Sequence, residues 1–532
     1  MGFVNLPLRA ILMRRNILLP DVKRWGVDQG PVVHLKEVCL SFGEKQVIDH
    51  LTLAIPVGKT TVIIGESGSG KSTLIKTMNG LLVPDSGQCH LFGQDTRHCG
   101  SSQIIELRKR TGTILQDYAL IDSISVYENI AFPIVENTSM PEAEVRKLVE
   151  ESLKPLGLLD AIDKYPYELS GGMKKRVSFA RATIHQPELV FFDEPTTGLD
   201  PLMIVFVDNI IRDMRKRYDM TSVIISHDIQ SIHRLADNVA FLHEGKIIFQ
   251  GSLDEIQASK AKNIRRFFDS SNKIAKTTTK SEPRAYVSVR NLYKSFAEKP
   301  VLKGVSLDVP ERKITVIIGG SGSGKSVLLK HILGLFTPDS GTVCVDGLEL
   351  TQCTERERET MRTHIGMLFQ GAALFDSMTV RDNIAFPLAE RRNPTPKDEI
   401  RSRVDEIMKR LKIDDIADAW PDSISAGQRK RVGLARAIIT KPKLMIYDEP
   451  TTGQDPIMIR YVDDMILEAH DEFQLTTIVI SHDMVSTFRI ADQIAMVYNG
   501  VIAAHGSPDE LLASPNPEVQ KMIRAQIPNT AS

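Results

Sequence analysis

Two stretches of the chain decide its fold, TVIIGESGSGKSTLIKTMNGLL (61–82) and TVIIGGSGSGKSVLLKHILGLF (315–336). Each joins a short β-branched run to a glycine-rich turn and then to a helical pattern, and each satisfies G-x-x-x-x-G-K-[ST]. Glycine lets backbone N–H groups wrap closely around phosphate oxygens, and the helix that follows offers the anion its positive end. The sequence therefore predicts two phosphate-binding loops.

The rest of the chain is also written twice. FFDEPTTGLDPLMI (191–204) returns as IYDEPTTGQDPIMI (446–459), and the segment 225–247 returns at 480–502. The offset is 254 residues at the first lysine pair and 255 at the histidines, so the repeat is a duplicated domain rather than a solenoid.

The stretch between the two copies, SSNKIAKTTTKSEPRA, is polar and indicates an extended linker. We therefore expect an N-terminal extension, a first domain, a linker and a second domain, over residues 1–30, 31–269, 270–285 and 286–532.

Strand patterns alternate with helical patterns in both halves. Apolar runs such as LVFFDE (189–194) and LMIYDE (444–449) end in carboxylates, while helical periodicity near 141–160 and 397–417 indicates an inserted helical segment. This alternation predicts an α/β fold with a mostly parallel sheet flanked by helices.

Composition narrows the function classes. Among 532 residues, 66 Lys and Arg oppose 67 Asp and Glu, so the formal net charge of −1 gives no global case for binding nucleic acid. No uninterrupted apolar run approaches ~18 residues, and residues 1–30 lack the pattern of a secretory signal. For residues 1–30 we favour an extension packed on the first domain over a basic amphipathic helix on lipid.

The five cysteines are odd in number and include no C-x-x-C pair, which argues against a disulfide framework or a structural zinc site and fits a reducing cytosol.

Residues with phosphate and metal chemistry recur in both halves. Lys71 and Lys325 are expected to reach the β- and γ-phosphates, and the hydroxyls of Ser72 and Ser326 to ligate Mg²⁺. The carboxylates at the strand ends supply a second set, in which the first acid holds Mg²⁺ through water (Asp193, Asp448) and the second polarises the attacking water (Glu194, Glu449). His227 and His482 each follow the first acid by 34 residues and could hydrogen-bond the γ-phosphate or that water.

A third motif makes the pattern specific. LSGGM (169–173) and ISAGQ (424–428) place Ser170 and Ser425 each 23 residues before the strand-end aspartate. With these motifs the sequence resembles a tandem ABC-transporter ATPase over roughly residues 32–265 and 286–520.

The resemblance implies two P-loop domains that bind ATP and Mg²⁺, each with a mostly parallel core sheet, an antiparallel β subdomain and a helical subdomain. It assigns Gln116 and Gln370 to a loop that touches Mg²⁺ and senses the membrane partner. It assigns Phe42 and Phe296 to stacking on adenine, although core packing is an alternative for both. The complete set of residues expected to contact ATP is Phe42, Gly65, Ser67, Gly68, Ser69, Gly70, Lys71, Ser72, Thr73, Gln116, Ser170, Gly171, Gly172, Asp200, Phe296, Gly319, Ser321, Gly322, Ser323, Gly324, Lys325, Ser326, Val327, Gln370, Ser425, Ala426, Gly427 and Asp455.

The same resemblance implies that two ATP-binding domains pair head to tail, within one chain or in a homodimer. Site one would combine the first phosphate loop with Ser425 and Gly427, and site two the second loop with Ser170 and Gly172. Ala426 stands where the family has glycine, and its Cβ is expected to restrict the backbone and crowd the phosphate. We therefore expect site two to carry more turnover than site one.

An ATPase without a membrane span of its own would energise a separate integral-membrane permease from the cytoplasmic side of the inner membrane. The second half resembles ATPases of Mce/Mla-type phospholipid transport in 321–335, 366–388 and 448–458, with the apolar segment FDSMTV (375–380) where a permease would dock. An amphipathic face of the helical subdomain is the alternative interpretation of that segment.

A fused ATPase of a peptide importer or of another small-solute importer is the alternative function. Tandem ATPases of sugar importers commonly carry one degenerate half, whereas both halves here keep the complete catalytic set, which argues against a sugar importer. An ABC-F translation factor needs a longer charged linker than 270–285, and a zinc-bearing DNA-repair ATPase needs paired cysteines.

Overall fold

The computed structural model describes residues 17–18, 23–115, 118–269, 284–297, 299–390 and 395–526. The chain divides into two compact units whose main boundary lies between Phe268 and Asp269, and these are called unit 1 and unit 2 below. Most of the expected linker, residues 270–283, lies outside the described residues, and the first strand of unit 2 begins at Ala285.

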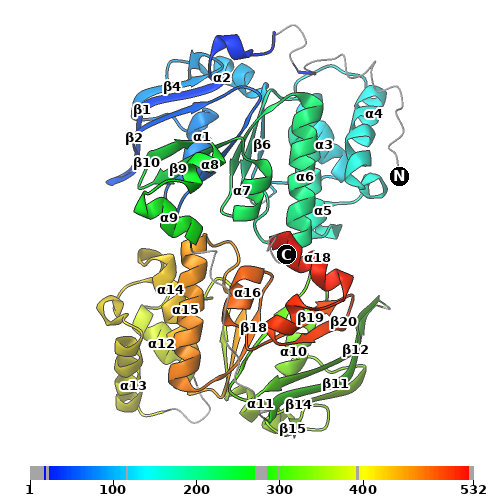
Figure 1. The fold of residues 1–532 in the computed structure, drawn as a ribbon, viewed down its shortest axis with the longest axis vertical. Helices are drawn as coiled ribbons and strands as arrows, with labels where there is room; N and C mark the ends of the chain where they lie inside the picture. Colours follow the sequence, from blue (N-terminus) through cyan, green and yellow to red (C-terminus); the bar gives the residue numbers. More distant parts are fainter. Residues whose placement is uncertain are drawn as a thin grey trace. The chain divides into compact units, whose positions relative to one another are not determined.

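Unit 1 contains two sheets (Figure 1). An antiparallel sheet has the order β2-β1-β4-β5, and a six-stranded sheet has the order β10-β9-β3-β8-β7-β6, parallel except for β10. The strands are β1 (Val33–Phe42), β2 (Lys45–Ile55), β3 (Thr60–Ile64), β4 (Ser86–Leu91), β5 (Gln94–Asp95), β6 (Thr111–Ile114), β7 (Leu189–Asp193), β8 (Thr221–Ile225), β9 (Asn238–His243) and β10 (Lys246–Gly251). The α-helices are α1 (Lys71–Met78), α2 (Ser101–Arg108), α3 (Val126–Val135), α4 (Glu142–Leu153), α5 (Gly171–Thr183), α6 (Pro201–Tyr218), α7 (Ile229–Leu235), α8 (Leu253–Gln257) and α9 (Lys262–Asp269), with short 3₁₀ turns η1 (Val27–Gln29), η2 (Lys154–Leu156), η3 (Leu159–Ala161) and η4 (Pro166–Glu168).

Unit 2 repeats this plan with sheet orders β12-β11-β14-β15 and β16-β17-β18-β13-β19-β20. The strands are β11 (Ala285–Phe296), β12 (Lys299–Pro310), β13 (Ile314–Ile318), β14 (Ser340–Val345), β15 (Leu348–Glu349), β16 (Ile365–Leu368), β17 (Leu444–Asp448), β18 (Thr476–Ile480), β19 (Gln493–Tyr498) and β20 (Val501–Gly506). The helices are α10 (Lys325–Ile332), α11 (Glu355–Arg362), α12 (Val380–Ala389), α13 (Lys397–Arg410), α14 (Ala426–Ile438), α15 (Pro456–Phe473), α16 (Met484–Ile490), α17 (Pro508–Leu512) and α18 (Pro517–Gln526), with η5 (Asp414–Ile416) and η6 (Pro421–Ser423).

The two phosphate-loop strands lie inside their sheets. β3 has β8 and β9 as neighbours, β13 has β18 and β19, and both strands are buried at every position. A strand buried on both faces has to be apolar along its length, which explains the β-branched TVII runs. The expected α/β fold with a mostly parallel sheet and an added antiparallel sheet is confirmed.

The inserted helical segments are also confirmed. Helix α4 covers much of the first expected stretch and α13 the second, and each packs with its neighbours, α3 or α12, through Val and Ile side chains. In Figure 1 the helices α3, α4 and α5 gather on the side of the parallel sheet of unit 1 that lies away from β1, β2 and β4. The arrangement gives each unit a helical lobe distinct from its antiparallel sheet.

The described part of the N-terminal extension packs on unit 1. Arg24 donates from Nη1 to the carbonyl of Tyr218 (2.8 Å), and the backbone N–H of Trp25 donates to the Glu188 carboxylate (2.7 Å). The indole of Trp25 lies edge-on against Phe92 with 6.4 Å between the ring centroids. These contacts support the packed extension for residues 23–30, while residues 1–16 and 19–22 lie outside the described part of the chain. No helix among the described residues is long and apolar enough to cross a membrane.

Candidate functional site

Each phosphate loop follows a buried strand and begins at a glycine that no other residue could replace. A Cβ at Gly65 would lie 2.1 Å from the carbonyl oxygen of Leu242, and one at Gly319 would lie 2.2 Å from that of Val497. Lys71 donates from Nζ to the carbonyls of Gly65 (2.9 Å) and Glu66 (2.8 Å), and Lys325 makes the same two bonds in unit 2. The loop is thus folded around its own lysine.

The loops offer donors that the described residues leave without acceptors. Ser69 Oγ and Ser323 Oγ are buried and hydrogen-bond to no other described residue. Gly68 and Gly322 are exposed, have φ of +80° and +75°, and have open space where a Cβ would stand. A curved glycine backbone with buried orphan hydroxyls fits a bound anion such as a triphosphate.

Oxygen groups suited to Mg²⁺ converge beside the loop in unit 1. Ser72 Oγ lies 3.2 Å from Asp193 Oδ1, which suits a cation that prefers hydroxyl, carboxylate and water ligands. Burial is the main cause that raises the pKa of Asp193. The hydrogen bond from Ser72 opposes this shift, and the negative charge of Glu194 adds to it. In unit 2 burial likewise raises the pKa of Asp448, and no bond between Ser326 and Asp448 is present among the described residues.

The second carboxylate of each pair contacts the expected histidine. His227 Nδ1 lies 3.5 Å from Glu194 Oε1, and His482 Nδ1 lies 3.7 Å from Glu449 Oε1. Burial is the largest single influence on Glu194 and opposes its ionisation, but His227, Thr197 and Lys71 together outweigh it, and the pKa of Glu194 lies below its usual value. For Glu449 the His482 contact is the largest influence and again lowers the pKa. Each pair therefore holds one carboxylate whose pKa is raised and one whose pKa is lowered, as acid–base sites often do.

Both glutamates have an unusual backbone. Glu194 has φ of 50° and Glu449 has φ of 47°, in the left-handed region that non-glycine residues rarely adopt. Their N–H groups donate to Ile225 O (3.1 Å) and Ile480 O (2.9 Å) at the end of the adjacent strand. Thr197 Oγ1 donates to the Glu194 carboxylate (2.9 Å), so the backbone and the side chain are both restrained. Strain of this kind concentrates at functional sites.

The serines of the LSGGM and ISAGQ motifs, which we call the signature motifs, cap helices α5 and α14, the signature helices. Ser170 Oγ accepts from Met173 N (3.3 Å) at the start of α5, and Ser425 Oγ accepts from Gln428 N (3.2 Å) at the start of α14. Neither serine side chain hydrogen-bonds to any other described residue, so the structure does not bring them to the phosphate loop of their own unit. Both capping serines are exposed, and a helix N-terminus suits an anion, although Ala426 is half-buried and Gly427 is buried in the first turn of α14.

One part of the expectation for Ala426 is wrong. The preceding serines have nearly the same dihedral angles (φ −65°, ψ 159° and φ −66°, ψ 161°), and both Gly171 and Ala426 are the first residues of their helices. Gly171 does not have a positive φ, and a Cβ there would meet only Tyr118 Oη at 3.5 Å, which is ordinary contact. A helical backbone accepts a methyl group, so Ala426 does not restrict the backbone.

Two further groups of expected residues are the phenylalanines and the aspartates. Phe42 and Phe296 are 52% and 42% exposed, so simple core packing does not account for either ring. Asp455 caps α15 through N–H groups of Ile457 and Met458 (both 3.0 Å), and Asp200 precedes α6.

The other expected residues flank the loop lysines or follow the sixth strand of each unit. Ser67 and Ser321 are exposed four residues before the lysine, and Thr73 and Val327 are half-buried two residues after it. Gln370 is exposed, whereas Gln116 lies outside the described residues.

Sequence reasoning missed two buried lysines on the signature helices. Lys175 donates from Nζ to Thr197 O (2.6 Å), and Lys430 donates to Pro450 O (2.8 Å) and to the carbonyl of Gln370. Burial lowers the pKa of each lysine to about 8. These lysines tie the signature helix to the loop after the glutamate, and in unit 2 also to Gln370. Their recurrence 255 residues apart was the available signal.

Two buried asparagines were missed as well. Asn129 Nδ2 donates to the carbonyls of Ile121 (3.0 Å), Ile124 (3.2 Å) and Ser125 (3.0 Å), and its Oδ1 accepts from Ile121 N (2.9 Å). Asn383 makes the same four bonds to the segment that begins at Phe375. Each asparagine therefore holds the loop that follows the expected glutamine.

The known proteins to which the chain is similar are described as ABC transporter proteins. A family model described as "ABC transporter" matches residues 48–197 and 302–452. A Bacillus cereus protein assigned by prediction as an ABC transporter ATP-binding protein is 30% identical over 513 residues, which cover 88% of this chain and 89% of that protein. A Vibrio parahaemolyticus protein with the same kind of assignment is 29% identical and covers 89% of this chain and 88% of its own length. A solved structure of cbiO1 from Clostridium perfringens, described as part of the ABC transporter complex cbiONQ, is 29% identical over 46% of this chain and 96% of that chain, with a TM-score of 0.41.

Proposed function

The chain belongs to the ABC transporter family of ATP-binding proteins, and on that premise we propose that it energises a separate membrane permease for phospholipid or another lipid. It is an ATP-binding subunit whose two ATPase domains bind and hydrolyse ATP with Mg²⁺ as the usual ion, and such subunits work with membrane permease components. The proposal adds the cargo, the docking surface and the roles of individual residues.

The roles follow from the site geometry. Lys71 and Lys325 would exchange their loop carbonyls for phosphate oxygens, and Ser72 with Asp193, or Ser326 with Asp448, would hold Mg²⁺, directly or through water. Bound Mg²⁺ supplies charge neutralisation on the phosphates. Glu194 and Glu449, ionised and restrained, would accept a hydrogen bond from the attacking water.

The observation that carries the separate permease is an apolar segment after the expected glutamine of each unit. Phe375 is 41% exposed and Ile121 is 39% exposed, although each begins a segment that a buried asparagine fixes through four hydrogen bonds. Phe375 also packs against Phe386, with 4.7 Å between the ring centroids and the ring planes tilted by 50°. A rigid loop that presents an apolar side chain to solvent supports a docking surface for a partner.

The lipid cargo rests on the likeness of the second half to Mce/Mla-type ATPases. The stretches GMLFQGAALFDSMTVRDNIAFPL (366–388) and DEPTTGQDPIM (448–458) carry it, and the first stretch contains the docking segment. The permease would place the chain as a peripheral subunit on the cytoplasmic side of the inner membrane.

Purification of the chain from its native membranes tests this proposal. We expect an integral-membrane permease with bound phospholipid, identified by mass spectrometry, and ATPase activity of the complex that rises when phospholipid is supplied. Phe375→Glu should release the permease, while Leu335→Glu, which alters a more exposed apolar side chain elsewhere in unit 2, should retain it. A permease that copurifies with a peptide- or sugar-binding protein and carries no lipid would overturn the lipid assignment.

We further propose that the two domains of one chain pair head to tail around two ATP molecules. Among the described residues, the side chains of Ser170 and Ser425 form no hydrogen bond with the phosphate loop of their own unit, which supports completion by the other domain. A homodimer is the competing arrangement, and the test belongs to the whole molecule, below.

A further inference from the structure

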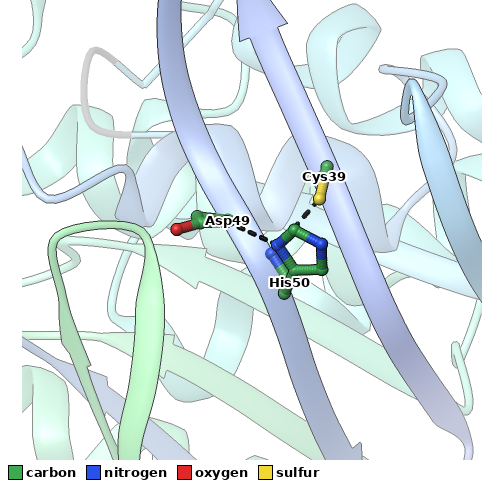
Figure 2. A group of neighbouring side chains, drawn as sticks. All are labelled: Cys39, Asp49 and His50. Atoms are coloured by element: carbon green, nitrogen blue, oxygen red, sulfur yellow. Dashed lines mark hydrogen bonds and ion pairs between the residues drawn. The ribbon is translucent and has the colours of Figure 1, made fainter.

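Three metal-ligating side chains lie together on the β1–β2 hairpin of unit 1, outside the nucleotide site. Cys39 lies on β1, and Asp49 and His50 lie on β2 (Figure 2). One ligand atom from each residue lies within 4.8 Å of the other two. A thiol, a carboxylate and an imidazole in one cluster form a mixed donor set of the kind that binds Zn²⁺.

The hydrogen bonds in this cluster prepare the groups as ligands. The backbone N–H of His50 donates to Cys39 Sγ (3.3 Å), which holds the sulfur beside the strand that carries Asp49 and His50. Asp49 Oδ2 pairs with Lys246 Nζ (2.9 Å), while Oδ1 contacts His50 Nδ1 (2.6 Å). Lys246 therefore orients the carboxylate from behind, as outer partners of metal ligands do.

The backbone at His50 is strained, and the duplicated unit shows that the strain belongs to this side chain. His50 has φ of 45°, whereas the equivalent residue in unit 2 is Gly304 with φ of 87°. The correspondence is secure because Leu51 pairs with Val38 and Val305 pairs with Leu292 at the same register. Glycine adopts the left-handed backbone conformation without the steric penalty of a Cβ, so the histidine at this position has a conformational cost.

Unit 2 lacks the other two ligands as well. Tyr293 takes the place of Cys39, since each pairs with an equivalent serine on the next strand. Lys303 takes the place of Asp49, since both donate their N–H to the glycine carbonyl of the adjacent hairpin. The fold of the hairpin therefore does not need these three side chains, and their presence in unit 1 calls for another explanation.

We propose that Cys39, Asp49 and His50 bind a thiophilic divalent transition metal, with Zn²⁺ as the best match. Three protein ligands would leave one position for water or a partner's ligand. Ligands on tetrahedral Zn²⁺ lie about 3.5 Å apart, so the cluster has to contract, and the 67%-exposed His50 side chain has room to move. Binding by the thiolate releases the thiol proton to solvent. The spacing C-x₉-D-H has no paired cysteines, which is why the sequence predicted no zinc site.

The site lies on the hairpin that covers the first phosphate loop. Val47, two residues before Asp49, places Cγ1 and its carbonyl 3.1 Å from where a Cβ on Gly70 would stand, and Phe42 ends the β1 strand that carries Cys39. A metal that ties β1 to β2 would brace this hairpin beside the nucleotide site of unit 1 alone.

Titration of the nucleotide-free full-length chain with Co²⁺ tests the proposal, because a Co²⁺–thiolate bond gives a charge-transfer absorption that oxygen ligands do not give. We expect one thiolate-ligated Co²⁺ per chain, displaced by Zn²⁺. Cys39→Ser should abolish the absorption, and His50→Gly should weaken Co²⁺ and Zn²⁺ binding by about ten-fold or more. Cys353→Ser in unit 2 is the matched control and should change neither.

His50→Gly also guards against a folding artefact, because glycine suits the left-handed backbone. This variant should unfold at the same temperature as the metal-free wild type or at a higher one, while losing the stabilisation that Zn²⁺ gives the wild type. Absorption that survives Cys39→Ser, or that disappears only with Cys99→Ser, would overturn the assignment, as would wild-type protein that shows no thiolate absorption with excess Co²⁺.

Discussion

At the scale of single residues, Glu194 and Glu449 are the groups on which hydrolysis should depend. Each is ionised, contacts a histidine and is held in a left-handed backbone. We predict that Glu194→Gln combined with Glu449→Gln lowers ATP turnover by at least about 100-fold, because the base that polarises water is lost, while ATP binding persists. Steady-state ATPase rates and binding of a fluorescent ATP analogue measure the two effects. Loss of binding together with turnover would contradict the role.

The single variants test whether the sites are equal. Site two is expected to carry more turnover, so Glu449→Gln should remove more than half of the activity and Glu194→Gln less than half. Since Ala426 leaves the helix N-terminus unchanged, only its methyl group can crowd the phosphate. Ala426→Gly in the Glu449→Gln background should therefore raise the remaining rate a few-fold. Equal losses in the two single variants would remove the asymmetry.

At the scale of elements, buried lysines link the signature helices to the active-site loops. Burial lowers the pKa of Lys430 to about 8 from 10.5, so above pH 8 the unfolded chain binds more protons than the folded one. The stability of the wild type should thus gain about 2 kcal/mol between pH 7 and pH 10 from this group. Denaturant unfolding of Lys430→Met should lack that gain. Identical pH dependence in the variant and the wild type would show that the lysine keeps its ordinary pKa.

The loops that present Phe375 and Ile121 depend on one side chain each. Asn383→Leu leaves several buried backbone groups without partners, and we predict a loss of about 3 kcal/mol in the free energy of unfolding. Asn129→Leu should cost unit 1 a similar amount. Asn137→Leu, at an exposed position, should change the free energy of unfolding by less than about 0.5 kcal/mol. A small effect at Asn383 would mean that the loop is held by other contacts.

The phosphate loops could be predicted from the sequence, whereas the buried polar residues that hold the neighbouring loops could not. Glycine spacing and β-branched runs are local, so β3, β13 and the loops that follow them were predictable. Asn383 and Lys430 were not, because a polar residue in a helical pattern normally faces water. The carbonyl partners of Asn383 lie 4, 5 and 8 residues before it in the chain, and those of Lys430 lie 20 residues after it and 60 residues before it. The left-handed His50 was hidden for the same reason, since its register depends on pairing between strands.

At the scale of the whole molecule, the mass of the ATP-trapped state distinguishes pairing within a chain from pairing between chains. One chain has a mass of 59.3 kDa. The chain with Glu194→Gln and Glu449→Gln should retain two ATP molecules and keep the mass of one chain, because both domains come from the same polypeptide. Mass photometry with and without Mg-ATP makes the measurement, and a doubled mass with ATP would establish the homodimer instead.

The contact between Trp25 and Phe92 makes unit 1 structurally different from unit 2 at one surface. In unit 1 the indole of Trp25 covers Phe92, but in unit 2 Asp346 stands at the equivalent place, and Tyr286 and His364 line an open cavity of about 390 Å³ there. A gene for the first half alone should therefore begin before Lys23, because a shorter protein would lack Trp25 and its contact with Phe92. In the second half the matching sequence position is Thr279, which lies outside the described residues. The two halves therefore share their phosphate loops and strand-end carboxylates but differ at the surface beside Phe92 and Asp346.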